Sequence, residues 1–244
     1  MRTVLALVAA MWLACLPPVA MAQMIRLGAG FAASGAPIPP PPPAAGTWLA
    51  TLNTPALIYS NGNDTVALNA ADTAGTNAAT YETTPRAGGK YYLELTVSYT
   101  GSPCCFSGGF VDSAALPTTG TSGGLTNAYS GASIIFSTGV VSGGGSASLA
   151  TLGAVASGSV VAFAYDVTNK AIWIKAGCAG QWNASSTANP ATATGGLSLT
   201  GGTINTPYPA AGDGYFTGTA DVATINVGAT AFACPIPAGF TAWN

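Results

Sequence analysis

Residues 157–183, SGSVVAFAYDVTNKAIWIKAGCAGQWN, constrain the fold more than any other stretch of the chain. Residues 160–165 read VVAFAY, an unbroken apolar run that is typical of a β-strand covered on both faces. The turn formers Asp166 and Asn169 follow, and short polar side chains at such positions bond back to the local backbone. A second β-prone run, AIWI, begins at Ala171. Because an isolated hairpin is barely stable in water, a hairpin this apolar predicts a larger sheet assembly that buries it.

Residues 47–244 are predicted to form a single all-β domain. Short apolar runs in this region are separated by Gly, Asn, Pro and Thr, and no helical periodicity extends over a useful length. The region is long enough to bury a sizeable core, so we expect a two-sheet antiparallel β-sandwich. Apolar side chains alternate along residues 91–97, which predicts a strand with one apolar face. Other expected strands are residues 133–136 and 220–227, and the expected Gly/Ser/Thr-rich loops are residues 116–127 and 142–147.

Residues 1–22 have the pattern of a signal peptide. Arg2 supplies a positive end, residues 4–16 an apolar centre, and the AMA sequence that ends at residue 22 a small-residue cleavage site. An uncleaved signal anchor is the alternative. If the chain instead starts at Met21 or Met24, the protein would stay in the cytoplasm, as phage virion components usually do.

Residues 23–46 are expected to be a Pro/Gly/Ala-rich linker between the signal peptide and the β domain. The run of prolines at residues 39–43 favours a stiff, extended polyproline conformation. We interpret this run as a spacer and not as a ligand for a proline-binding partner, because no flanking basic residues set an orientation.

Four segments follow one another along the chain: GKYYLEL (residues 89–95), the hairpin at residues 160–174, PYPA (residues 207–210) and the ending INVG…PAGFTAWN (residues 225–244). In this order they resemble motifs of SPRY domains. The resemblance covers residues 47–244 and implies a concanavalin A-like jelly roll with two antiparallel sheets. WN at residues 182–183, followed by NPAT (residues 189–192) and GG (residues 195–196), is most similar to SPRY modules of phage, prophage and bacterial surface proteins.

The charge of the chain argues against a nucleic-acid partner. Six Lys and Arg stand against eight Asp and Glu, for a net charge of −2, and only 6% of the residues are charged. Binding to phosphates requires clustered cations, whereas these are scattered: Arg86, Lys90, Lys170 and Lys175. We therefore expect no nucleic-acid partner, and no membrane partner once the signal peptide has been cleaved.

The cysteines give a conditional prediction. Outside the signal peptide the chain has Cys104, Cys105, Cys178 and Cys234, which allow three pairings that the sequence does not distinguish. A bond between the neighbours Cys104 and Cys105 would be strained, so each is expected to reach Cys178 or Cys234. An exported protein would then have two disulfides, whereas a cytoplasmic one would have reduced, mostly buried thiols. Zinc is not expected, because adjacent cysteines chelate it poorly and the chain has no His.

Catalysis finds little support in the sequence. The absence of His removes the ordinary Ser-His and Cys-His nucleophile systems and the commonest general base. Glycoside hydrolysis requires two facing carboxylates, but Glu82 and Glu94 are far apart in sequence and the Asp residues are isolated. We predict a protein that is not an enzyme and that has no cofactor.

The SPRY resemblance implies that ligands, usually peptides and sometimes glycans in microbial relatives, are bound by loops at one end of the sandwich. Aromatic rings can stack on sugars or anchor an interface, and amide and carboxylate groups make directional hydrogen bonds. For Trp182, packing on the sheet is an equal alternative, and Trp173 and Trp243 are assigned to the fold. The candidate ligand-binding residues are Asp112, Tyr129, Trp182, Asn183, Asp213, Tyr215 and Phe216.

These features predict a non-catalytic recognition module that is secreted, periplasmic or displayed on a cell surface and that contacts a glycan or a protein. The alternative is a structural component of a phage or prophage virion, such as a tail-associated or decoration protein. Because so few charges protect the edge strands, we also expect an oligomer or a larger assembly.

Overall fold

Two β-sheets make up most of what the computed structural model describes of the chain, which is residues 46–50, 57–68, 78–100, 106–116, 125, 131–213 and 221–244. These residues belong to one compact unit, Pro42–Asn244. The signal peptide and almost all of the linker predicted for residues 1–46 lie outside the described residues. No α-helix occurs in the described ranges, and no helix there is long and apolar enough to cross a membrane.

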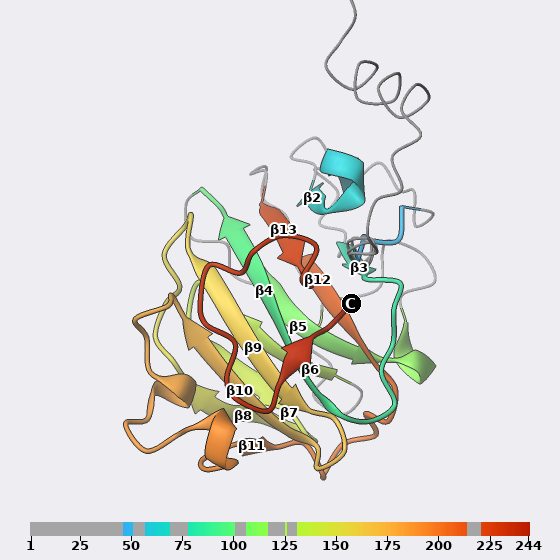
Figure 1. Cartoon of the computed structure of the whole chain (residues 1–244). Helices are drawn as coiled ribbons and strands as arrows, with labels where there is room; N and C mark the ends of the chain where they lie inside the picture. The colour runs from blue at the N-terminus through green and yellow to red at the C-terminus, as the bar shows by residue number, and fades with distance from the viewer. Residues whose placement is uncertain are drawn as a thin grey trace, which may run out of the picture. The chain divides into compact units, whose positions relative to one another are not determined.

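The larger sheet has eight strands, seven of them in the order β1-β2-β13-β4-β9-β10-β11. Its neighbours are antiparallel apart from β14, which pairs in parallel with the start of β4. In Figure 1 the long strands β4, β9 and β10 lie side by side in the middle of this sheet. The bounds are β1 (Leu57–Ser60), β2 (Thr65–Leu68), β4 (Lys90–Ser98), β9 (Val160–Asp166), β10 (Ala171–Ala176), β11 (Leu197–Ser198), β13 (Val222–Asn226) and β14 (Thr241–Ala242).

The smaller sheet has six antiparallel strands in the order β3-β12-β5-β6-β7-β8 and packs against the larger one. Its strands are β3 (Ala78–Tyr81), β5 (Ser107–Asp112), β6 (Gly131–Ile135), β7 (Val140–Gly143), β8 (Ser146–Thr151) and β12 (Pro207–Asp213). The two sheets confirm the predicted all-β antiparallel sandwich.

The core between the sheets is built from the alternating positions that the sequence indicated. Leu93 and Leu95 of β4 and Phe163 of β9 are 1% exposed or less. Phe110 reaches across from β5 in the smaller sheet, with its ring centroid 5.8 Å from that of Phe163. Trp243, which follows β14, adds its ring 5.1 Å from Phe110, so the last described strand completes the core.

The hairpin β9–β10 is buried on both faces, as its apolar sequence predicted. Phe163 and Ile174, which pair across the two strands, point into the core between the sheets. Ala164 and Trp173, paired one step away, point to the opposite face and belong to a second apolar cluster. All four side chains are 1% exposed or less.

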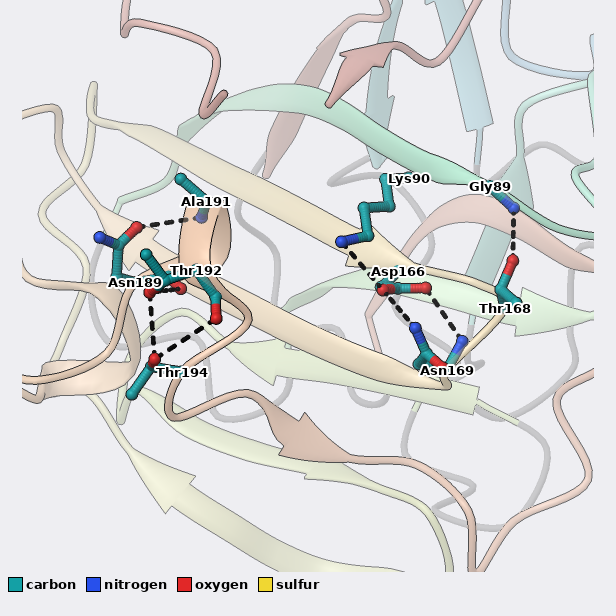
Figure 2. Close-up of polar contacts among 9 residues, drawn as sticks. All are labelled: Gly89, Lys90, Asp166, Thr168, Asn169, Asn189, Ala191, Thr192 and Thr194. Atoms are coloured by element: carbon teal, nitrogen blue, oxygen red, sulfur yellow. Dashed lines mark hydrogen bonds and ion pairs between the residues drawn. The ribbon is translucent and has the colours of Figure 1, made fainter. Parts of the chain in front are cut away.

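The turn of this hairpin is held by Asp166, as the sequence also predicted. Asp166 Oδ1 accepts a 2.9 Å hydrogen bond from the backbone N–H of Asn169, and its Oδ2 accepts one of 2.8 Å from the Asn169 amide. Lys90 Nζ lies 3.5 Å from Asp166 Oδ2, and the N–H of Gly89 donates to the hydroxyl of Thr168. Figure 2 shows how these contacts fasten the turn to the start of β4.

The loop predicted for residues 142–147 is wrong at both of its ends. Ser142 and Gly143 belong to β7, and Ser146 begins β8. The register between the two strands shifts between Val141 and Gly143, so β8 is paired irregularly. β8 is rich in Ser and Ala, lies beside three glycines, and has Thr151 as its only β-branched residue and no aromatic one, so it lacks most of the pattern by which strands are recognised.

Candidate binding surface

The second apolar cluster covers the outer face of the larger sheet. Tyr92 of β4 and Trp173 of β10 lie opposite the same residue of the strand between them, Ala164. With Ala162 they form an apolar patch, and each of the four side chains is 1% exposed or less. Two segments that are far apart in the sequence bury this patch.

The first segment, which we call the platform, is residues 177–196. It contains the 3₁₀ helices η4 (Trp182–Ala184) and η5 (Pro190–Thr192). Asn183 fixes the platform to β10: its side-chain oxygen accepts from the N–H of Ile174, and its amide donates to the carbonyls of Ile172 and Gly195. Asn183 has a left-handed backbone with φ of 51°, a conformation that Asn tolerates better than most residues.

The far end of the platform is held by Trp173 and by local polar contacts. The indole N–H of Trp173 donates a 2.7 Å hydrogen bond to the carbonyl of Thr194. Asn189 Oδ1 accepts from the N–H of Ala191, and the hydroxyls of Thr192 and Thr194 lie 3.0 Å apart (Figure 2). The platform is therefore a structured loop whose exposed groups are pre-positioned.

Trp182 and Lys175 form a stacked pair where the platform leaves β10. The ammonium of Lys175 lies 4.7 Å from the centroid of the Trp182 ring and donates to the carbonyl of Cys178. Burial lowers the pKa of Lys175, and the nearby charge of Glu94 opposes this effect. Trp182 itself is half-buried and packs against the second apolar cluster.

The second segment, which we call the strap, is residues 228–240, between β13 and β14. In Figure 1 it crosses in front of β4, β9 and β10. The ring of Phe232 packs edge-on against Tyr92 at 4.8 Å, and that of Phe240 against Trp173 at 6.2 Å. The strap therefore closes the apolar patch from above.

The carboxylate of Glu94 anchors the strap from below. Glu94 is 3% exposed and accepts three hydrogen bonds: from the Tyr92 hydroxyl at 2.7 Å and from the N–H groups of Ala233 and Cys234 at 2.8 Å each. Burial, and then the neighbouring Glu94, raise the pKa of Tyr92, so the phenol remains a donor. A buried carboxylate with this many donors is satisfied inside the fold.

A disulfide between Cys178 and Cys234 joins the platform to the strap. This corrects the expectation that Cys104 and Cys105 would each reach one of these two cysteines. Because one bond uses both of these cysteines, the two predicted disulfides do not form; Cys104 and Cys105 lie outside the described part of the chain. We call the platform and the strap together, joined by this bond, the latched surface.

The platform and the strap are largely exposed and polar, and neither segment carries a charged side chain. Residues 176–212 and 222–244 contain no Lys, Arg, Asp or Glu. Ile236 of the strap is 39% exposed, and the platform exposes Gln181, Thr187 and Thr192. Two cations beside the segments already have partners: Lys175 is buried and stacked on Trp182, and Lys90, whose Nζ lies 5.8 Å from the Phe240 ring centroid, pairs with Asp166. The two segments therefore offer apolar contact and neutral hydrogen bonds.

The structure does not bring the predicted site residues together. Trp182 and Asn183 lie on the platform, although Asn183 is committed to the backbone of β10. Asp112 is paired with Pro207 at one end of β12, whereas Asp213 ends the same strand, roughly 20 Å away along it. Asp112 and Asp213 are the last residues of β5 and β12, so their predicted placement in loops is wrong. Tyr129, Tyr215 and Phe216 lie outside the described residues.

Asp112 has partners within the fold. It is 3% exposed, and its carboxylate accepts the N–H groups of Ala114, Asn205 and Thr206. Burial opposes ionisation, but these backbone donors outweigh it and lower the pKa of Asp112. The carboxylate thus caps η3 (Ser113–Ala115) and fixes the segment before β12.

Asp213 faces another carboxylate that the sequence reading missed. Asp213 and Asp221 are 2% and 1% exposed. Burial, and then the adjacent Asp213, raise the pKa of Asp221 to about 7. Asp213 ends β12, and Asp221 immediately precedes β13. Two acidic residues that flank one short connection between strands are the sequence signal that could have linked them.

The described residues contain no group of three or more His, Cys, Asp or Glu side chains that could hold a metal ion. Sequence reasoning also missed the strap, with Ile236, as a surface. A run of Ala, Pro and Gly carries no strand or helix pattern, and its role depends on what lies beneath it.

Comparison with solved structures places the fold among SPRY domains. The SPRY domain of human HERC1 superposes with a TM-score of 0.50 at 10% identity, over 73% of this chain and 93% of that one. The PSpry domain of TRIM65 superposes with a TM-score of 0.52 at 9% identity, over 75% and 89% of the two chains. No family model and no curated protein sequence matches the chain. At these identities the likeness concerns the fold, and it supports the SPRY-like architecture that the motifs indicated.

Proposed function

We propose that this protein is a non-catalytic module that binds a protein ligand through the latched surface. The observation that carries the proposal is the disulfide-joined pair of segments, 177–196 and 228–240, which presents an exposed apolar side chain on a rigid, uncharged support. The SPRY-like fold supports a binding role, since loops on such a sandwich are free to vary without disturbing the core.

The rigidity of the latched surface favours affinity. Ordering a flexible loop on binding costs free energy, and a loop that is already held loses little. Asn183, Trp173 and the disulfide hold the platform before any ligand arrives. Ile236 on the strap would serve as the apolar anchor, and the exposed hydroxyl and amide groups of the platform would add neutral hydrogen bonds.

A neutral surface also defines the partner. A charged ligand would lose hydration at this surface and find no opposite charge on either segment, while the neighbouring Lys90 is already paired with Asp166. We therefore expect a partner whose contact region is uncharged and partly apolar. A protein fits this description better than a charged glycan, and a neutral glycan is the competing outcome of the test below.

Two further points belong to the same proposal. We propose that the module works outside the cytoplasm, because a disulfide persists in an oxidising compartment. The virion role stays the alternative; an intact mass with an N-terminus at Met21 or Met24 and free thiols would favour it. An N-terminus at Gln23 and a mass reduced by the hydrogens of the disulfide would favour export.

The test uses the purified protein as bait, with capture followed by affinity measurement on the isolated partner. Ile236→Asp should weaken binding by about tenfold or more, since it places a charge in an apolar contact. Ile58→Asp is the matched control, because Ile58 is the other large apolar side chain that the described residues expose, at 52%, and it lies on β1. Equal binding by the two variants, or a captured glycan in place of a protein, would overturn the proposal.

A further inference from the structure

We propose that the Cys178–Cys234 disulfide is a redox latch: while oxidised it holds the strap on the outer face of the larger sheet, and its reduction releases the strap. The inference rests on the proposed function only in that opening the latch would dismantle the binding surface. The opening itself can be observed without any ligand.

The strap has few other ties to the sheet. The N–H groups of Ala233 and Cys234 donate to Glu94, and that of Phe240 donates within the strap to the carbonyl of Pro237. Near its start, the strap is also held by Asn226 of β13, which accepts from the N–H of Gly228 and donates to the carbonyl of Ala231. Near its end, the centroid of the Phe240 ring lies 5.8 Å from Lys90 Nζ. Pro235 and Pro237 have no N–H to contribute. The strands on either side are different: the ends of β13 and β14 are paired with β4. Reduction would therefore free the middle of the strap and leave its two ends in place.

The contacts beneath the strap explain what the latch holds shut. Phe232 and Phe240 rest on Tyr92 and Trp173, and Cys234 itself is 2% exposed in the same cluster. The floor between the two aromatic residues is formed by small side chains such as Ala164, so the strap aromatics have little to interlock with there. Lifting the strap would expose the patch on β4, β9 and β10.

The bond is accessible from one side. Cys178 is exposed on the platform, whereas Cys234 is buried under the strap. A thiolate of a dithiol reductant can attack Cys178 Sγ, and Cys234 leaves as a thiolate that takes up a proton. The second thiol of the reductant then displaces Cys178, so both cysteines are reduced and the reductant becomes a disulfide.

The test follows backbone hydrogen–deuterium exchange in the whole protein with and without dithiothreitol. In the reduced protein we expect amides of residues 229–240 to exchange about tenfold faster or more through local opening. The amides of β9 should exchange faster only by what the lower overall stability accounts for, and should stay far better protected than the strap. Cys178→Ser is the matched variant: it should show the fast exchange without reductant, and the reductant should then change nothing further in the strap. An effect of the reductant that persists in Cys178→Ser would come from elsewhere in the chain.

Each outcome decides the proposal. Unchanged protection of residues 229–240 after complete reduction, verified by alkylation of both thiols, would overturn it, because Glu94 and the aromatic contacts would then hold the strap alone. Exchange of the strap and β9 at one common rate would also overturn it, since the strap would then open only when the whole fold unfolds. Failure of the oxidised protein to bind any protein would contradict the proposed function and leave the latch untouched.

Discussion

The carboxylate of Glu94 accepts a 2.8 Å hydrogen bond from the backbone N–H of Cys234, a residue 140 positions later in the chain. The bond links the middle of the central strand β4 to the strap that crosses it. Glu94 also holds Ala233 and the Tyr92 hydroxyl, so one side chain ties three parts of the outer face together.

Replacing Glu94 with Gln should therefore destabilise the protein. The Gln amide keeps one acceptor oxygen but turns the second into a donor that faces the N–H of Ala233. We expect a loss of about 1–3 kcal/mol in the free energy of unfolding, measured by urea denaturation. Thr96→Gln, at an exposed position of the same strand, is the control and should have little effect. A stability equal to that of the wild type would show that these donors find other partners.

Removing the disulfide should lower stability through the unfolded state. The bond closes a loop between cysteines 56 positions apart. The chain-entropy estimate for such a loop is about 4 kcal/mol, and measured values are often smaller. We expect the double variant Cys178→Ser/Cys234→Ala to unfold at a correspondingly lower denaturant concentration. In the presence of reductant the variant and the wild type should unfold together; a difference that survived reduction would point to damage in the second apolar cluster.

Trp243 should be highly sensitive to truncation. It is fully buried, packs on Phe110 and Tyr91, and donates from its indole N–H to the carbonyl of Thr84. Trp243→Ala should cost about 3–5 kcal/mol, since it removes a large core side chain and leaves a cavity. Trp182→Ala, at a half-buried site, should cost clearly less, and similar losses for the two would contradict this account of the core.

Asp221 gives the protein a predictable response to pH. Its pKa is raised from 3.8 to about 7 in the fold by burial and by Asp213. In the unfolded chain the group ionises near its ordinary value, so its contribution to stability is complete below about pH 4 and is lost as pH rises through about 7.

The measurement is the denaturation midpoint between pH 4 and pH 8. The wild type should lose stability over this range relative to Asp221→Asn, which cannot ionise there. Asp64→Asn, at a less buried carboxylate, is the control and should follow the wild type more closely. Parallel curves of midpoint against pH for the wild type and Asp221→Asn would show that the pKa of Asp221 is not raised in the fold.

Local pattern was enough to predict the sandwich and its central hairpin. The run at residues 160–165 is apolar at every position because both of its faces are covered, and Asp166 caps a turn through contacts only three residues away. Such features are encoded within a few residues. The same is true of the apolar face of β4, which follows from simple alternation.

The latched surface could not be predicted in this way. The partner of Cys178 depends on the path of a strap that has no regular pattern of its own. Asn183 was predicted to contact a ligand from a loop. Its side-chain amide instead makes hydrogen bonds with the backbone of Ile172, Ile174 and Gly195. Asp112 and Asp213 were grouped by their chemistry, but the antiparallel pairing of β5 and β12 puts them at opposite ends.

The burial of Trp243 has a consequence for the timing of folding. Every described strand of both sheets, β14 included, precedes Trp243 in the sequence, so each is synthesised before the indole that fills the space beside Phe110. Until Trp243 has been synthesised, the core between the two sheets lacks this indole, and the sheets pack less tightly there. The close packing of the two sheets beside Phe110 therefore depends on a residue that is translated after all of the described strands that it helps to hold together.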